Sequence, residues 1–233
     1  MIQLFNGDCL DILKTIPNHS IDLILTDPPY LHPHLGGLGN SALANRASKL
    51  KADIDFMSDG FDYETVFAEL MRVCKIPNML IFCSNAQIST FMRWFEDKDL
   101  SVTLLEWVKT NPIPTAFGNY LSDVEYIVCV RGKGATFNNS VPFDYKRKAY
   151  ISAIESNANR FHMAQKPIPL LEKLLEVHSN KGDTVLDCFM GSGSTGVACK
   201  KLERSFIGVE REQKYFEISE KRIQGQTIAR RLF

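Results

Sequence analysis

An apolar run that ends in two prolines places the strongest constraint on how this chain can fold. Residues 21–26 are Ile-Asp-Leu-Ile-Leu-Thr, which is typical of a buried strand, and Asp27, Pro28, Pro29 and Tyr30 follow directly. Each proline fixes its own φ angle and drives the preceding residue toward extended conformations. The sequence therefore predicts a stiff turn at the carboxyl end of a buried strand, with a carboxylate held just beyond it.

The groups in this turn suit a flat heterocycle that carries an amine. The Asp27 carboxylate and the backbone carbonyl of Pro28 are hydrogen-bond acceptors. Tyr30 adds an aromatic face on which a base can stack. A proline-rich turn with an aspartate cap and a surface tyrosine has the same sequence, so the tetrapeptide alone leaves a purely structural role open.

A glycine-rich turn farther along the chain has the layout of a nucleotide-binding turn. Residues 184–187 predict a buried strand, Gly191, Gly193 and Gly196 open a helix, and Glu210 ends the following strand. Glycines let the backbone approach a ligand, and a carboxylate at the position of Glu210 can accept hydrogen bonds from both ribose hydroxyls. A tight strand-to-helix turn without a ligand is the alternative.

Asp187, just before the glycines, distinguishes between two kinds of nucleotide. A diphosphate over this turn would be repelled by the Asp187 carboxylate unless a cation lay between them. A ligand with an ammonium group and a sulfonium would be attracted instead. S-adenosylmethionine has both groups, a ribose for Glu210 and no phosphate, and it is therefore the expected cofactor.

Strands and helices alternate along most of the chain, which predicts an α/β, doubly wound, mostly parallel sheet. Breaks at Asn111-Pro112 and Gly118-Asn119 leave no room for a crossover helix between the strands expected at 102–108 and 124–130. These two strands are therefore expected to pair antiparallel. The other predicted strands are 2–5, 21–26, 79–82, 184–187 and 206–209, and the predicted helices include 66–74, 87–96, 167–178, 197–202 and 213–223.

The composition is that of one soluble domain rather than two full domains. The chain has 233 residues, 45% of them hydrophobic, and Lys plus Arg equals Asp plus Glu at 27 each, so net charge neither indicates nor excludes a nucleic-acid partner. The six cysteines form no Cys-x-x-Cys pair, which predicts reduced thiols and no metal site. No signal peptide opens the sequence, and no apolar run approaches the roughly 18 residues of a membrane span, so we expect a cytoplasmic protein without a membrane partner.

The two motifs together resemble those of the amino-methyltransferases of DNA, in the permuted class whose Asp-Pro-Pro-Tyr motif precedes the glycine motif. The segment from Asp187 to Thr195 is the closest match, and the resemblance covers most of the chain. It implies one catalytic domain over 1–233, with a circularly permuted, seven-stranded methyltransferase sheet, an antiparallel terminal hairpin and a small target-recognition insertion. The chain would then start at the sheet's third strand and end with its first two.

The resemblance also implies roles for individual residues. Asp27, Pro28, Pro29 and Tyr30 match the catalytic loop, and Lys166 belongs to a segment similar to the family's helix-opening motif at the methionine carboxylate. A solvated lysine before a proline is the structural alternative for Lys166. The residues expected to bind S-adenosylmethionine are Asp8, Cys9, Lys166, Asp187, Phe189, Gly191, Gly193, Ser194, Thr195 and Glu210.

Two stretches without apolar periodicity are basic, residues 31–51 and residues 131–160. Residues 31–62 predict a mobile loop insertion, and residues 131–160 correspond to the family's target-recognition insertion. From 109 to 166 the chain has eight basic and four acidic residues, a local charge of +4. A solvated surface run is the alternative to a DNA contact there. The residues expected to contact DNA are Arg46, Lys49, Lys146, Arg147 and Lys148.

The implied reaction is direct methyl transfer from S-adenosylmethionine to the N6 amine of adenine in DNA, at a short or relaxed target, with base flipping. Cytosine N4 is the nearest alternative, because the pocket requires only an exocyclic amine. Methylation of RNA or of a protein glutamine amide is less favoured. A dinucleotide-dependent oxidoreductase would use the glycines and Glu210 but leave Asp27 to Tyr30 without a role, and a non-catalytic DNA-binding module would use neither motif. The expected partner is DNA, no metal is required, and a homodimer is left open.

Overall fold

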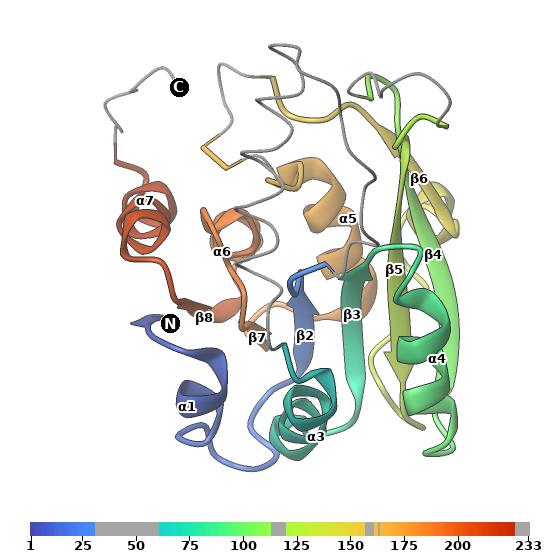
Figure 1. The fold of residues 1–233 in the computed structure, drawn as a ribbon, viewed down its shortest axis with the longest axis horizontal. Helices are drawn as coiled ribbons and strands as arrows, with labels where there is room; N and C mark the ends of the chain where they lie inside the picture. The colour runs from blue at the N-terminus through green and yellow to red at the C-terminus, as the bar shows by residue number, and fades with distance from the viewer. Residues whose placement is uncertain (31–60, 113–119, 157–160, 163, 227–233) are drawn as a thin grey trace, which may run out of the picture.

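The strands form one sheet, with the first strand of the chain at one edge. The computed structural model describes residues 1–30, 61–112, 120–156, 161–162 and 164–226, and Figure 1 draws the fold. Within these residues the sheet has eight strands in the order β1-β8-β7-β2-β3-β5-β4-β6. The strands are β1 (Ile2–Asn6), β2 (Leu23–Thr26), β3 (Asn78–Cys83), β4 (Ser101–Lys109), β5 (Val124–Arg131), β6 (Ala149–Ser152), β7 (Thr184–Asp187) and β8 (Ser205–Glu210). This order confirms that the last two strands of the chain lie between the first strand and β2.

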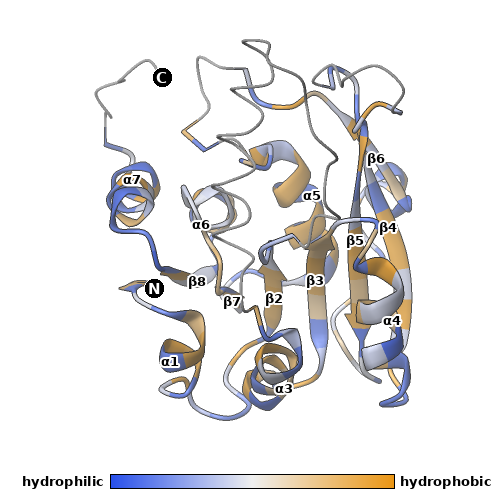
Figure 2. Cartoon of the chain, viewed as in Figure 1, coloured by the Kyte–Doolittle hydropathy of each residue, from blue (hydrophilic) through white to orange (hydrophobic). Residues whose placement is uncertain are grey.

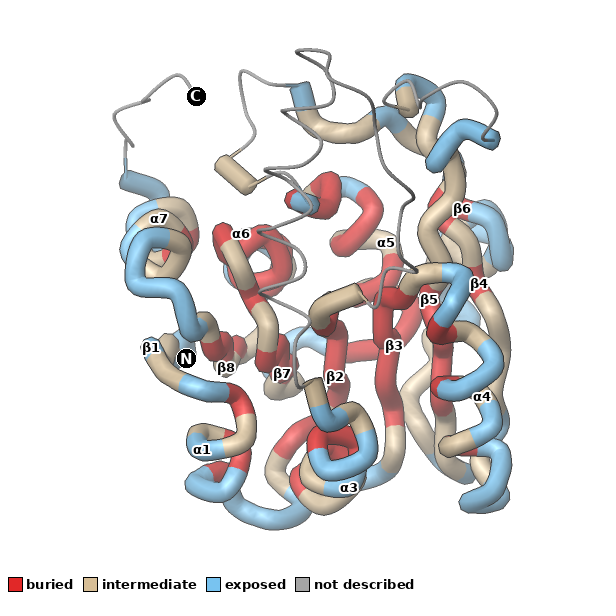
Figure 3. Tube along the Cα trace, viewed as in Figure 1, coloured by how far each residue is buried: buried red, intermediate tan, exposed pale blue. Residues whose placement is uncertain are grey.

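Helices cover both faces of the sheet, so the doubly wound architecture is confirmed. One face is packed by α1 (Cys9–Leu13), α3 (Tyr63–Val73) and α4 (Ile88–Glu96). The other face is packed by α5 (Ile168–His178), α6 (Ser194–Lys201) and α7 (Gln213–Gln224). In Figure 3 the central strands are mostly buried, whereas the outer turns of α1, α3 and α7 are exposed.

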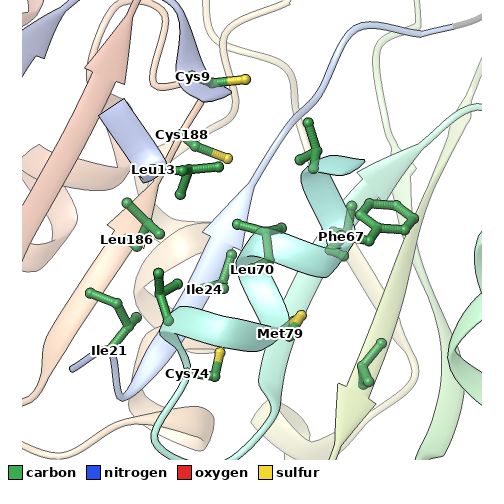
Figure 4. Close-up of a cluster of buried hydrophobic side chains, with 14 of the residues drawn as sticks. Cys9, Leu13, Ile21, Ile24, Phe67, Leu70, Cys74, Met79, Leu186 and Cys188 are labelled. Carbon is green, nitrogen blue, oxygen red and sulfur yellow. The ribbon is translucent and has the colours of Figure 1, made fainter. Parts of the chain in front are cut away.

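Successive side chains of the central strands point to opposite faces of the sheet and contribute to a hydrophobic core on each face. Ile24 of β2 faces the cluster under α1 and α3, whereas Leu23 and Leu25 face the cluster under α5 and α6. Because both faces are covered, the central strands β2 and β3 are almost continuously apolar rather than half polar, as the orange colour over most of β3 in Figure 2 shows. Figure 4 shows Phe67 and Leu70 of α3 among the side chains of the first cluster.

The directions of the strands bring several strand ends to one edge, which we call the carboxyl edge. β1, β8, β7, β2 and β3 are mutually parallel, so all five end there. β5 pairs antiparallel with both β3 and β4, as predicted for β4 and β5, and it therefore starts at the carboxyl edge. Cys83 at the end of β3 pairs with Tyr126, which places Glu125 at the same edge as Asp27.

Residues 131–156, the described part of the predicted insertion 131–160, are more regular than predicted. They include the 3₁₀ helix η1 (Phe143–Lys146) and strand β6, which pairs parallel with β4 from Glu106 and Ala149 to Lys109 and Ser152. In the described part of the chain the sheet thus has eight strands and not the predicted seven. β6 has four residues of which only Tyr150 is buried, too short an apolar pattern to detect in the sequence. Residues 31–60 of the predicted mobile loop lie outside the described part of the chain.

Candidate active site

The turn after β2 is fixed by a glutamine that the sequence analysis did not identify. Gln87, just before α4, is 1% exposed, and its Nε2 donates a hydrogen bond to the carbonyl oxygen of Pro29 at 3.2 Å. Its Oε1 accepts hydrogen bonds from the backbone N–H of Ser84 at 3.0 Å and from the Ser84 hydroxyl at 2.9 Å. Glutamine at the start of a helix is usually solvated, so the sequence held no signal of this role.

The two oxygens of the Asp27 carboxylate have different surroundings. Oδ2 accepts a hydrogen bond from the ammonium group of Lys166. Oδ1 is buried and has no hydrogen-bond partner among the described residues. A buried acceptor without a donor costs about 1–3 kcal/mol, so Oδ1 is an atom that the N–H of a ligand would stabilise.

Asp27 is the first member of a row of four alternating charges. Lys166 Nζ lies between Asp27 and Glu125, at 3.0 Å from Glu125 Oε2, and Glu125 Oε1 lies 2.9 Å from Lys109 Nζ. The hydroxyl of Tyr30 donates a hydrogen bond to Glu125 Oε2 at 3.1 Å. Two positive and two negative groups offset one another, which is what allows charges to be buried here.

The pKa values of Glu125 and Lys166, at the centre of this row, are set by neighbouring charges more than by burial. Burial alone would raise the pKa of Glu125, but the ammonium groups of Lys166 and Lys109 lower that pKa to about 2. Burial also disfavours the charged form of Lys166, yet the carboxylates of Asp27 and Glu125 hold its pKa above the usual range. Burial raises the pKa of Asp27, and the ammonium of Lys166 works in the opposite direction. Glu125 and Lys166 are therefore both charged at neutral pH.

The glycine turn leads from β7 into α6 and is held by Glu210. Gly191 and Gly193 have left-handed φ angles of 50° and 79°. Glu210 Oε2 accepts a hydrogen bond from the N–H of Gly191 at 2.9 Å, and Oε1 accepts one from the N–H of Glu212 at 2.7 Å. No atom of the described residues beyond its own chain neighbours lies within 4 Å of the position that a Cβ on Gly191 would take, so the described structure leaves the backbone there open to a ligand.

Unlike Gly191, the other two glycines of the motif are closely packed, and a Cβ on Gly193 would lie 2.8 Å from Ser219 Cβ of α7. A Cβ on Gly196 would lie 2.4 Å from Ile223 Cδ1 and 2.7 Å from Phe206 Cε1. Such contacts are too close to be accommodated without movement of the neighbours. The third glycine of the motif therefore allows α6 to pack against α7 and β8.

Asp187 links the two motifs. Its Oδ1 accepts hydrogen bonds from the hydroxyl of Thr26, the last residue of β2, at 2.8 Å, and from the N–H of Phe189 at 3.1 Å. The side chain is 3% exposed. Burial raises the pKa of Asp187 to about 6, and hydrogen bonds from Thr195 and Thr26 oppose that shift.

Hydrogen bonds tie the glycine turn both to α7, through Arg222, and to the segment before α5, through Gln165. Arg222 of α7 donates hydrogen bonds to the carbonyl oxygen of Ser192 at 2.5 Å and to the hydroxyl oxygen of Ser194 at 3.3 Å. The hydroxyl of Ser192 donates to Gln165 Oε1 at 3.2 Å. Arg222 could not be predicted from the sequence, because an arginine on an amphipathic helix is usually a solvated charge.

The remaining predicted cofactor residues lie beside the end of β8. Asp8 caps α1, its Oδ1 accepting a hydrogen bond from the N–H of Leu10 at 2.9 Å. Cys9 is buried, and burial raises the pKa of its thiol to about 12, so it is neutral. The ring of Phe189 contacts Phe61 edge to face, with centroids 5.6 Å apart. The structure thus brings Asp8, Asp27, Asp187 and Glu210 to the carboxyl edge.

The basic run of residues 146–148 does not lie at the carboxyl edge. Lys146 ends η1 and donates a hydrogen bond to the carbonyl oxygen of Asn139 at 3.0 Å. Lys148 directly precedes β6, and Ser152 at the end of β6 pairs with Lys109 at the end of β4, which lies at the carboxyl edge. Four residues of strand, about 13 Å at ~3.3 Å per residue, separate Lys148 from the carboxyl edge. Arg46 and Lys49 lie outside the described residues.

Comparison with known proteins identifies one family. Residues 21–221 match the N6_N4_Mtase family model, described as DNA methylase. The chain belongs to this DNA methylase family. Over 249 residues it is 30% identical to the type II methyltransferase M.HinfI of Haemophilus influenzae, an alignment that covers 94% of this chain and 67% of that protein. It is 27% identical to the type II methyltransferase M2.DpnII of Streptococcus pneumoniae, an alignment that covers 96% of this chain and 90% of that protein.

Solved methyltransferase structures share the fold. A complex of M1.HpyAVI with SAM is 32% identical, with a TM-score of 0.72 and coverage of 95% of this chain and 100% of that one. A PvuII DNA methyltransferase described as cytosine-N4-specific is 17% identical with a TM-score of 0.70, a likeness of fold alone. The DNA methylase described here is therefore an S-adenosylmethionine-dependent DNA methyltransferase, and its family includes both N6 and N4 enzymes.

Neither a metal centre nor a membrane helix is found in the described part of the DNA methylase. Among those residues, no group of three or more His, Cys, Asp or Glu side chains could hold a metal ion. No helix formed by those residues is long and apolar enough to span a bilayer.

The raised pKa of Asp187 predicts a pH-dependent loss of stability. Its pKa is about 6 in the folded protein against an ordinary 3.8, so the folded state holds the proton more tightly. The free energy of unfolding should therefore fall as pH rises from about 4 to 6, by about 3 kcal/mol for two units of pKa. Asp187→Asn lacks this titration. In urea denaturation, the stability of the wild type relative to Asp187→Asn should decrease across that window, and a constant difference would contradict the raised pKa.

Proposed function

We propose that the protein transfers the methyl group of S-adenosylmethionine to the N6 amine of adenine in DNA, at a short or relaxed target and with the base turned out of the duplex. The observation that carries this proposal is Asp27 Oδ1, a buried acceptor with no donor among the described residues. It stands at the carboxyl edge in the same turn as the aromatic ring of Tyr30. An acceptor beside a stacking surface suits the exocyclic amine of a flipped base.

The carboxylates and the open glycine turn fit S-adenosylmethionine. Glu210 ends β8 with a carboxylate suited to the ribose hydroxyls, and the backbone at Gly191 is open to a ligand. Asp187 attracts an ammonium group and repels a diphosphate. When bound, this cofactor supplies an electrophilic methyl group on its sulfonium. The residues that we assign to its binding are Asp8, Cys9, Asp187, Phe189, Gly191, Gly193, Ser194, Thr195 and Glu210.

Orientation of the amine is the main catalytic contribution of the chain. The amine of adenine is a weak nucleophile because its lone pair is delocalised into the ring. Asp27 Oδ1 and the carbonyl oxygen of Pro28 would accept hydrogen bonds from its two N–H groups and turn the lone pair toward the methyl group. As the N–C bond forms and the S–C bond breaks, the sulfonium would become a neutral thioether and the methylated nitrogen would release one of its protons. Gln87 holds this turn through the carbonyl of Pro29, so the acceptors are in place before the base arrives.

Adenine is favoured over cytosine by the first residue of the catalytic motif. Asp27 occupies the position where the adenine enzymes of the family have aspartate and where serine is common in the cytosine enzymes. Both bases present an exocyclic amine, so the same acceptors would serve either one. Cytosine N4 is therefore the second outcome that an assay must distinguish.

Nucleoside mass analysis of DNA incubated with the protein and S-adenosylmethionine tests the proposal. We expect N6-methyladenine to be the modified nucleoside. N4-methylcytosine instead would overturn the choice of base. The absence of any methylated nucleoside from genomic DNAs of varied sequence, with a protein that binds S-adenosylmethionine, would contradict the proposed function.

The role of Asp27 is tested by Asp27→Ala. Loss of one preorganised contact of this kind typically lowers the rate by about 100-fold or more, so we expect at least that loss in single-turnover methyl transfer. The affinity for S-adenosylmethionine, measured by calorimetry, should stay within about twofold of the wild type. Asp11→Ala, which removes an exposed carboxylate of α1, is the matched control and should retain full activity. A near-normal rate for Asp27→Ala would refute the orienting role.

We further propose that residues 146–148 contact phosphates on DNA that flanks the flipped base. Their place about 13 Å from the carboxyl edge is within the ~20 Å that six base pairs of duplex span, at ~3.4 Å each. Each phosphate contact contributes about 0.9 to the slope of log K against log salt. Replacing Lys146, Arg147 and Lys148 together by alanine should weaken DNA binding and flatten its salt dependence.

The control for this triple variant removes two exposed lysines, Lys14 and Lys181, from the end of the sheet at which the parallel strands begin. Lys14→Ala combined with Lys181→Ala should leave the salt slope at its wild-type value. Affinity for S-adenosylmethionine should not change in either variant. An unaltered salt slope in the triple variant would remove this segment from the DNA interface.

A further inference from the structure

We propose that Lys166 is a positioning residue for Asp27 rather than a ligand of the cofactor's carboxylate, and that Glu125 is the residue that holds Lys166 in place. The inference rests on the proposed function, in which Asp27 accepts a hydrogen bond from the target amine. It assigns to strand β5, through Glu125, a part in the catalytic geometry that neither sequence motif contains.

The hydrogen-bonding capacity of Lys166 is already used within the protein. An ammonium group has three hydrogens and no acceptor. Four oxygens surround Lys166 Nζ: Asp27 Oδ2, Glu125 Oε2 at 3.0 Å, the Tyr30 hydroxyl at 3.3 Å and the Ala164 carbonyl at 3.4 Å. No hydrogen is left for a carboxylate of the cofactor unless one of these contacts is given up.

The place of Lys166 is fixed from several elements of the fold. The residue directly precedes Pro167, which starts α5 with a φ of −64°. The ring of Phe82, at the end of β3, lies 4.8 Å from the ammonium, and the ring of Tyr30 lies 5.4 Å from it. The side chain is 6% exposed, so the ammonium cannot swing into solvent without breaking these contacts.

The consequence for Asp27 is a carboxylate with one oxygen occupied and the other presented. Lys166 holds Oδ2, which leaves the partnerless Oδ1 as the acceptor for the amine. Glu125 is held in turn by Lys109, whose Nζ also donates to the carbonyl oxygen of Ser122 at 3.1 Å. The row of charges thus extends from the catalytic turn to the hairpin between β4 and β5, and it sets the direction in which Asp27 points.

The same row determines how easily Asp27 is ionised. Lys166 favours the carboxylate, whereas burial, Glu125 and the nearby carboxyl of Asp187 favour its protonation. The remaining titratable neighbours are Tyr30 in the same turn and Cys83 at the end of β3, both neutral at physiological pH because burial raises their pKa. A protonated Asp27 is a poorer acceptor for the amine, so the rate should fall as pH drops through the pKa of Asp27.

Lys166→Met tests the proposal through the pH dependence of single-turnover methyl transfer. An opposite charge in contact lowers the pKa of an aspartate by about 1–3 units, so the acidic limb of the profile should move to higher pH by about that amount. S-adenosylmethionine affinity should stay within about twofold of the wild type. An acidic limb at its wild-type pH would overturn the proposal, and a tenfold loss of cofactor affinity with that unmoved limb would make Lys166 a cofactor ligand instead.

Glu125→Gln should move the profile the other way. The amide keeps the size of the side chain but removes a negative charge that raises the pKa of Asp27, so the acidic limb should shift to lower pH. Because Lys166 would be held less firmly, the rate on the plateau should fall as well, by about tenfold. Shifts of the same sign in Lys166→Met and Glu125→Gln would contradict the electrostatic account.

Two further variants keep the test decisive. If Lys166→Met does not fold, Lys166→Met combined with Glu125→Gln removes one charge of each sign and should still raise the acidic limb. Lys173→Met removes a lysine of α5 that pairs with Asp144 at 3.2 Å, and it should leave the profile unchanged. An active Asp27→Ala would refute the proposed function itself, whereas an inactive Asp27→Ala with an unmoved limb in Lys166→Met would refute only this inference.

Discussion

The cost of burying carboxylates at the ends of parallel strands is the constraint on which the rest of this structure depends. Five parallel strands end at one edge, so Asp27, Asp187 and Glu210 are brought close together whether or not their charges favour it. Each carboxylate is stabilised by donors of a different kind: an ammonium for Asp27, a hydroxyl for Asp187 and backbone N–H groups for Glu210. These donors offset the desolvation, and they also fix the direction in which each carboxylate points.

The Asp27–Tyr30 turn and the glycine turn are joined by a direct contact between the neighbouring strands that precede them. The Thr26 hydroxyl bonds to Asp187 across the pair of β2 and β7, although the two residues are 161 positions apart in the chain. A permuted order of motifs is therefore no obstacle, because adjacency in the sheet and not in the sequence sets the distance between them. The acceptor assigned to the base and the carboxylate assigned to the cofactor stand on the same rigid support, as transfer between two bound molecules requires.

The sequence predicted the parts of this site that follow from local pattern. Apolar runs located the central strands, and the residues after those runs were the carboxylates of the edge. Gln87, Arg222 and the pairing of Glu125 with Lys166 were not predictable, because each depends on which strand lies beside which and in what direction. Lys166 illustrates the difference: resemblance placed it in the right segment, but its partners come from β5 and from the turn after β2. Strand β6 was missed because an edge strand with one buried residue has no periodicity to detect.

The central claim is that this edge selects a nucleoside with positive charge over one with phosphates. Calorimetric titration of the free protein with S-adenosylmethionine and with NAD, repeated on Glu210→Ala, tests it most directly. The account predicts binding of S-adenosylmethionine that is weakened about tenfold or more by loss of the Glu210 carboxylate, as expected when charge-assisted hydrogen bonds of about 1.5–3 kcal/mol are removed. It predicts no comparable binding of NAD, and tighter binding of NAD than of S-adenosylmethionine would contradict the account.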